Sequence, residues 1–155
     1  MMTNFPDIPT EPEKKLIINN ESGESVPVKE RELLKLAEIT EKNEAVRFKE
    51  IELVYVDEDE IVRINREFLD RDYVTDIITF RYDEDDQAIE GTLYCCAPRI
   101  AEQSAEFDNS MKTEFLRVFV HGLIHLAGYN DQTPKEKKQM TELEDRYLEA
   151  LKELL

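Results

Sequence analysis

Hydrophobic positions in this chain form short continuous runs that alternate with stretches of helical spacing. The runs are rich in β-branched and aliphatic residues and predict strands over residues 15–20, 51–56, 76–82 and 89–97. Apolar residues that recur every three or four positions predict helices over 28–42, 58–68, 98–107, 109–127 and 133–154. The order of these elements indicates a domain that contains both helices and strands.

Local signals fix several helix starts and the character of the last helix. Capping sequences predict N-terminal caps at Asp57, at Asn109 or Ser110, and at Thr133. The last helix carries apolar residues at helical spacing, and its acidic residues are assigned to the solvated side. These residues are Glu142, Glu144, Asp145 and Glu149.

The order of strands and helices also predicts how the strands connect. The strand, helix and strand over residues 51–82 predict a βαβ unit. The acidic loop 83–86 joins the last two strands, which predicts a hairpin with a solvated turn that protects the sheet edge. At 155 residues the chain is expected to form one domain, and residues 1–14, which contain three prolines, are expected to be loosely ordered.

The candidate metal-binding residues are concentrated in the segment His-Gly-Leu-Ile-His-Leu-Ala-Gly-Tyr-Asn-Asp at residues 121–131. His121 and His125 are the only histidines, and their spacing places both rings on one helix face. Gly128 can end the helix with positive φ, so that the chain turns and returns Asp131 toward the rings. Three such ligands leave one position of tetrahedral zinc open for water, which indicates hydrolysis; the alternatives are two ordinary histidines on a helix and an Asp131 that only caps the turn.

This segment resembles the signature HGxLHLxGYDH of the YbeY family of endoribonucleases. Asp131 stands where the family has a third histidine, and Asn130 stands where it has aspartate. The resemblance implies one Zn²⁺ held by His121, His125 and Asp131, since a carboxylate can replace imidazole on zinc. It also implies a single-strand-specific endoribonuclease that acts in 16S rRNA maturation and ribosome quality control, with rRNA and the small ribosomal subunit as partners.

Residues 64–80 carry a second resemblance to the same family, to its segment LNxxYRxKDxxTDVLSF. The family's arginine falls on Leu69, and Arg71 is a candidate catalytic replacement; the alternative is an Arg71 paired with its acidic neighbours. The family's Gly-Asp in the following strand becomes Gly91-Thr92, which predicts the loss of a polar group near the site. The fold implied is α/β, with a small mixed sheet of about four strands, about five helices and the metal-binding helix at the centre.

Arg117 is the other candidate catalytic residue. Glu114, Arg117, His121 and His125 are spaced by three, four and four residues, which aligns them along one stripe of the helix. Arg117 either holds a phosphate beside the metal or pairs with Glu114, and its fork of donors suits both.

Composition limits the partners. The formal net charge is −16, so the overall field repels phosphate, and contact with RNA must come from local arginines and the metal. No stretch has the length of a membrane span or the order of a signal peptide, which predicts a cytoplasmic protein with no membrane partner; DNA is not expected as a partner either. Cys95 and Cys96 are neighbours in a strand and should point to opposite faces as reduced, buried thiols.

Two other functions fit the same residues. The spacing HxxxHxxGxxD resembles a metzincin peptidase, but Gly122 occupies the position where HExxH peptidases carry their general base. The second alternative is a ribosome-associated binding protein that holds a structural metal. The departures from the family pattern at Leu69, Thr92 and Asp131 and the net negative charge favour it. Cleavage of casein without cleavage of RNA would indicate the peptidase, whereas RNA turnover that depends on His121 would exclude the binding protein.

Overall fold

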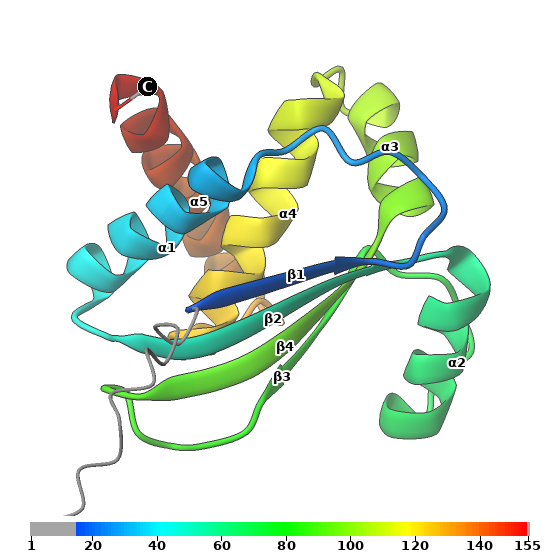
Figure 1. Ribbon diagram of the computed structural model, residues 1–155, viewed down its shortest axis with the longest axis horizontal. Coiled ribbons are helices and arrows are strands. Elements are labelled where there is room, and N and C mark those ends of the chain that lie inside the picture. Colours follow the sequence, from blue (N-terminus) through cyan, green and yellow to red (C-terminus); the bar gives the residue numbers. More distant parts are fainter. Residues whose placement is uncertain (1–14, 155) are drawn as a thin grey trace, which may run out of the picture.

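The computed structural model describes residues 15–154 and has a mixed α/β fold with four strands and five helices in this range (Figure 1). The predicted fold class is therefore confirmed. The expectation for residues 1–14 lies outside the described residues. The elements are β1 Leu16–Asn20, α1 Glu30–Glu44, β2 Phe48–Val56, α2 Glu58–Leu69, β3 Ile77–Arg81, β4 Ile89–Cys96, α3 Ala97–Glu106, α4 Met111–Leu126 and α5 Pro134–Leu154.

The predicted helix starts are confirmed. Asp57 accepts a hydrogen bond from the backbone N–H of Glu60, and Ser110 caps α4 through the N–H of Thr113. At α5 the Thr133 hydroxyl accepts from the N–H of Glu136, whose carboxylate accepts in return from the N–H of Thr133. These caps satisfy N–H groups that have no partner within their own helix.

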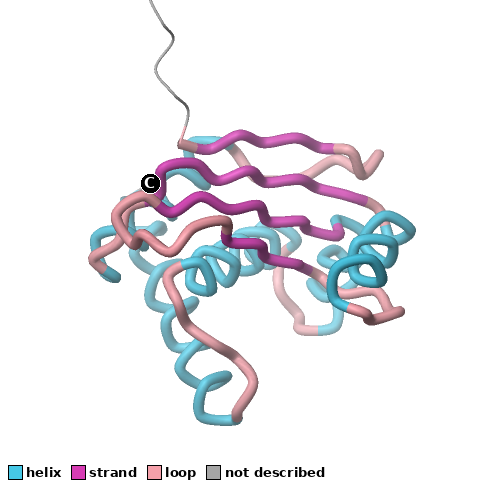
Figure 2. The backbone as a smooth tube through the Cα atoms, turned by 90° about the horizontal axis from the view of Figure 1, so that it is seen from below, coloured by secondary structure: helices cyan, strands magenta, loops and turns pink. Residues whose placement is uncertain are grey.

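The sheet has the strand order β1-β2-β4-β3, in which only β3 is antiparallel to its neighbour (Figure 2). The hairpin of β3 and β4 is confirmed, but the predicted βαβ unit of β2, α2 and β3 is wrong. A hairpin forces β3 to run against β4, and β4 runs parallel to β2, so β3 is antiparallel to β2 and separated from it. The parallel crossover is instead formed by β1, α1 and β2.

Alternation along the strands divides the buried residues between the two faces of the sheet. Ile51, Leu53 and Leu93 pack with α1, α4 and α5 in the larger cluster, whereas Val54 and Val56 pack with α2 in a smaller one. Cys95 belongs to the first cluster and Cys96 to the second, and both are free thiols, as predicted. No helix within residues 15–154 combines the length and apolar character needed to cross a membrane.

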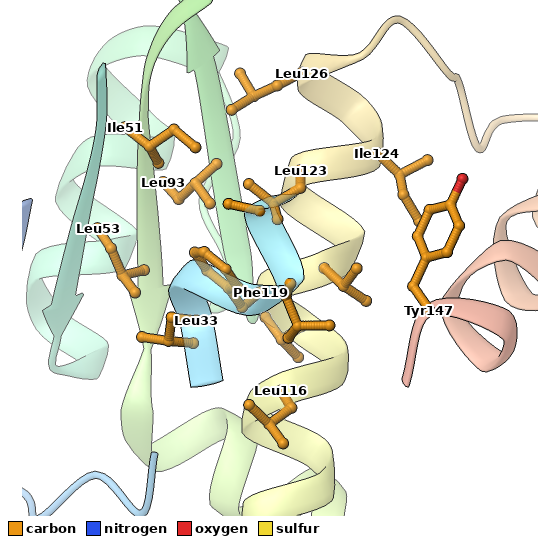
Figure 3. Packing of buried hydrophobic residues seen from close by; sticks show 14 of the residues in the cluster. Leu33, Ile51, Leu53, Leu93, Leu116, Phe119, Leu123, Ile124, Leu126 and Tyr147 are labelled. Atoms are coloured by element: carbon orange, nitrogen blue, oxygen red, sulfur yellow. The ribbon is translucent and has the colours of Figure 1, made fainter. Parts of the chain in front are cut away.

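Helix α4 is the central helix of the larger layer (Figure 3). Leu116, Phe119 and Leu123 point toward the sheet, while Ile124 packs near Tyr147 of α5. Two glycines allow the end of α4 to approach the hairpin closely. A Cβ atom on Gly122 would lie 2.8 Å from Ile77 Cδ1 and 2.9 Å from Leu93 Cδ1. A Cβ atom on Gly91 would lie 2.6 Å from the Phe80 carbonyl oxygen and 2.7 Å from Leu126 Cδ2. The last turn of α4 is thereby seated beside edge strand β3.

Candidate metal centre

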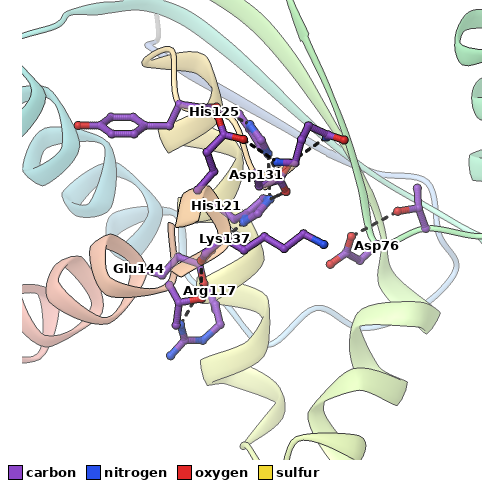
Figure 4. Close-up of polar contacts among 12 residues, drawn as sticks. Asp76, Arg117, His121, His125, Asp131, Lys137 and Glu144 are labelled. Atoms are coloured by element: carbon purple, nitrogen blue, oxygen red, sulfur yellow. Dashed lines mark hydrogen bonds and ion pairs between the residues drawn. The ribbon is translucent and has the colours of Figure 1, made fainter. Parts of the chain in front are cut away.

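The structure brings the three predicted metal ligands together (Figure 4). The Nε2 atoms of His121 and His125 lie 3.0 Å apart on neighbouring turns of α4. Gly128 has φ +109°, a conformation that lets the chain leave the helix and return Asp131 to the rings. Asp131 Oδ2 lies 3.3 Å from His121 Nε2 and 3.4 Å from His125 Nε2, and one donor atom from each residue fits within 4.8 Å.

The other nitrogen of each ring is already bonded. His121 Nδ1 lies 2.7 Å from Glu144 Oε2, and His125 Nδ1 lies 2.8 Å from the carbonyl oxygen of Tyr129. A carbonyl and a carboxylate only accept, so both Nδ1 atoms act as donors, and the Nε2 atom of each ring is the one that faces the other ligands. These two Nε2 atoms and one carboxylate oxygen of Asp131 converge within 3.0–3.4 Å, in the way that ligands of a single metal ion do. This donor set fits a metal ion.

Glu144 changes the environment of His121 most. Burial lowers the pKa of His121, whereas the hydrogen bond and the charge of Glu144 raise it. The charges of Asp76 and Asp131 raise this pKa further, so the effect of burial is more than offset. The net result is a pKa raised above the ordinary value of histidine. A carboxylate behind a ligating imidazole orients the ring and makes it a stronger ligand.

The assignment of Glu144 to the solvated side of α5 is wrong, because its side chain is buried behind His121. The sequence does contain a signal for this position. Glu144 follows Met140 by four residues and precedes Leu148 by four, so it lies within the apolar stripe of the helix. A carboxylate on a buried stripe requires a partner, and here the partners are His121 and Arg117.

Arg117 contacts the acidic residues of α5 and does not pair with Glu114. Its Nη1 lies 3.0 Å from Glu144 Oε1, and its Nη2 lies 2.7 Å from Asp145 Oδ1. Glu114 is buried and accepts a hydrogen bond from Asn109 Nδ2 at 3.1 Å. Of the two alternatives left open for Arg117, the pair with Glu114 is therefore not formed, because α5 offers Arg117 two carboxylates at once.

A second set of contacts fixes the loop behind His125. The Tyr129 hydroxyl donates to Glu44 Oε1 at 2.7 Å, and the Tyr147 hydroxyl donates to the other oxygen of Glu44. Glu44 is the last residue of α1, so it ties this helix to α5 and to the loop after α4. These bonds hold Tyr129, whose carbonyl oxygen accepts from His125.

A cleft of about 490 Å³ opens from the metal centre along edge strand β3. Its lining includes Leu69, Arg71, Asp76, Arg81 and Asn130, together with the three candidate ligands. Arg81 Nη1 donates to the Leu126 carbonyl oxygen at 2.9 Å and so caps the end of α4.

Arg71 is exposed at this cleft and does not pair with its acidic neighbours. Asp72 pairs instead with Arg66, and no carboxylate within residues 15–154 lies at ion-pair distance from the Arg71 guanidinium. Leu69, which takes the place of the family's arginine, also lines the cleft.

Thr92 lies away from the cleft, contrary to the expectation that it replaces a polar group near the site. Strand alternation turns it to the face opposite Gly91, where the Tyr82 hydroxyl donates to Thr92 Oγ1 at 2.8 Å. Thr92 therefore belongs neither to the lining of the cleft nor to the candidate metal ligands.

Comparison with known proteins agrees with this geometry over most of the chain. The family model described as Endoribonuclease YbeY matches residues 17–152. The chain belongs to the YbeY family. It is 36% identical over 136 residues to Endoribonuclease YbeY of Chloroherpeton thalassium, which covers 88% of this chain and 94% of the relative.

Two further comparisons support the assignment. Endoribonuclease YbeY of Cytophaga hutchinsonii is 38% identical over 111 residues, with 72% of this chain and 78% of the relative covered. The solution structure of a Thermotoga maritima protein superposes with a TM-score of 0.60 at 33% identity and covers 88% of both chains. The mixed sheet and its helices therefore form the fold of a solved relative.

Proposed function

We propose that this protein is a zinc-dependent, single-strand-specific endoribonuclease that acts in the cytoplasm on ribosomal RNA, in 16S rRNA maturation and ribosome quality control. The observation that carries the proposal is the convergence of His121, His125 and Asp131 in a chain of the YbeY family. The relatives' name, Endoribonuclease YbeY, supports RNA as the substrate.

His121, His125 and Asp131 would hold the metal, and imidazole and carboxylate ligands suit zinc. When bound in such a site, Zn²⁺ supplies a Lewis acid and lowers the pKa of water. The residues of the chain perform the remaining tasks. Glu144 and the Tyr129 carbonyl orient the two rings, and Arg71 lies at the cleft with its guanidinium available for a substrate phosphate.

Arg117 is proposed to act on catalysis indirectly. Two nitrogens of its guanidinium are bonded to Glu144 and Asp145, so it holds Glu144 against His121 and does not receive the phosphate. A peptidase is disfavoured, because the place of its general base is Gly122, which has no side chain and packs closely against Ile77 and Leu93.

The test is cleavage of labelled single-stranded and duplex RNA by the zinc-loaded protein, with His121→Ala as the matched variant. We expect single-stranded RNA to be cut and the variant to lose this activity while remaining folded. RNA binding without cleavage would instead indicate the ribosome-associated binding protein. Casein cleavage without RNA cleavage would indicate the peptidase, and either outcome would overturn the proposal.

A further inference from the structure

Lys137 lies on the same stripe of α5 as Glu144. The two residues are seven positions apart, which is close to two helical turns, so their side chains leave nearly the same face. Glu144 bonds to His121, and this face of α5 is therefore turned toward the metal end of α4. In the view of Figure 4 the exposed Lys137 side chain points in the direction of Asp76, which lines the cleft.

The backbone of Lys137 is fixed in the first turns of α5. Its N–H donates to the Thr133 carbonyl oxygen at 2.9 Å, and its carbonyl oxygen accepts from the Thr141 hydroxyl at 3.1 Å. The helix thus starts from a capped end, and the direction of the Lys137 stem follows from the helix itself.

The ammonium group of Lys137 has no carboxylate partner in the part of the chain from 15 to 154. The nearby acidic groups have other contacts. Glu144 binds Arg117 and His121, and Asp76 Oδ2 accepts from Gln103 Nε2 at 3.2 Å. An exposed cation without an ion-pair partner in this range therefore extends from the helix face that carries Glu144, in a protein with a formal net charge of −16.

The electrostatics of RNA binding require positive charge at this place. A substrate phosphate beside the ligands meets the carboxylates of Asp131 and Asp76, and Leu69 adds no charge where the family carries arginine. Arg81 is occupied with the end of α4 and with Asp86. This leaves Arg71, from the segment that precedes β3, and Lys137, from α5.

We propose that Lys137 is a substrate-binding residue that contacts a phosphodiester oxygen of the RNA beside His121, His125 and Asp131. This proposal rests on the proposed function and adds a residue to it. Lysine suits this role as a compact charge on a flexible stem, which can follow a phosphate without a fixed geometry. Together with Arg71 it supplies the positive charge that the cleft lacks at Leu69.

The test compares Lys137→Gln with Lys138→Gln, which removes the same charge from an exposed neighbour turned about 100° around the helix. Binding is measured between low and moderate salt with a short single-stranded 2′-O-methyl RNA that the zinc-loaded wild type is first shown not to cut. One lost phosphate contact lowers the slope of log Kd against log salt by about 0.7. We expect this decrease in Lys137→Gln only, with kcat/KM for unmodified RNA reduced at least about tenfold and restored in part by Lys137→Arg.

Zinc content and thermal stability are measured on the same variants, and we expect both to match the wild type. An equal salt slope in Lys137→Gln and wild type would overturn the role of Lys137 while leaving the proposed function intact. Loss of zinc from Lys137→Gln would assign the residue to the metal centre and would also overturn it. A wild-type protein that neither binds nor cuts RNA would overturn the proposed function, and the role of Lys137 with it.

Discussion

His121 and His125 present the same atom to the same point, but the protein supports them in different ways. His121 is backed by the carboxylate of Glu144, which comes from another helix and is bonded in turn to Arg117. His125 is backed by the neutral carbonyl of Tyr129, only four residues along the chain. One ligand is therefore supported by charge across the fold and the other by local backbone, so changes behind the two should differ in size.

The largest effect should come from removing a ligand itself. We expect His125→Ala and Asp131→Ala to lose the metal, with about one equivalent of zinc retained by the wild type. Elemental mass spectrometry after removal of free zinc measures this directly. Arg71→Ala, at an exposed residue of the same cleft with no bond to the candidate ligands, is the control and should keep its zinc. Full zinc retention by Asp131→Ala would mean that the carboxylate only caps the turn.

The next effect should come from the charged support of His121. Glu144→Gln keeps the size of the side chain but removes its charge, and we expect zinc affinity to fall about 10- to 100-fold. Competition with a chromophoric chelator measures the change. Glu142→Gln removes an exposed carboxylate from the same helix and should bind zinc like the wild type. Equal affinities in the two variants would show that Glu144 contributes only to packing.

The smallest effect should come from the support of His125. Tyr129→Phe removes the hydrogen bond to Glu44 but keeps the carbonyl that faces His125 Nδ1. We expect the free energy of unfolding to fall by about 1 kcal/mol, because one hydrogen bond is lost while Tyr147 still donates to Glu44. Zinc affinity should change less than in Glu144→Gln. Denaturant unfolding and chelator competition measure the two quantities, and a larger loss of zinc affinity than in Glu144→Gln would reverse the order.

The difference between local contacts and contacts across the fold also explains which features could be predicted from the sequence. The helices, the strands and the caps at Asp57, Ser110 and Thr133 follow from neighbouring residues, and the structure agrees with them. The close approach of Asp131 to His121 and His125 also follows from local spacing and the turn at Gly128.

Contacts between distant elements were harder to predict. Glu144 lies 23 residues from His121, and the contact depends on how α5 packs on α4, which no local pattern specifies. The contacts of Arg117 with Glu144 and Asp145 have the same cause, because the sequence offered Glu114 of its own helix as the alternative partner and did not show that α5 lies beside α4. The βαβ prediction failed likewise, since the position of β4 between β2 and β3 is a property of the whole sheet.

The close packing at Gly91 and Gly122 has a consequence for substrate selection. Edge strand β3 and the end of α4 form two sides of the cleft, and their separation is set by contacts of backbone and Leu126 in the interior. The width of the cleft is therefore determined by contacts in the hydrophobic interior. A methyl group added at either glycine would push β3 and the end of α4 apart and widen the cleft. The preference of the proposed enzyme for single-stranded over duplex RNA would then change without any alteration of a polar group.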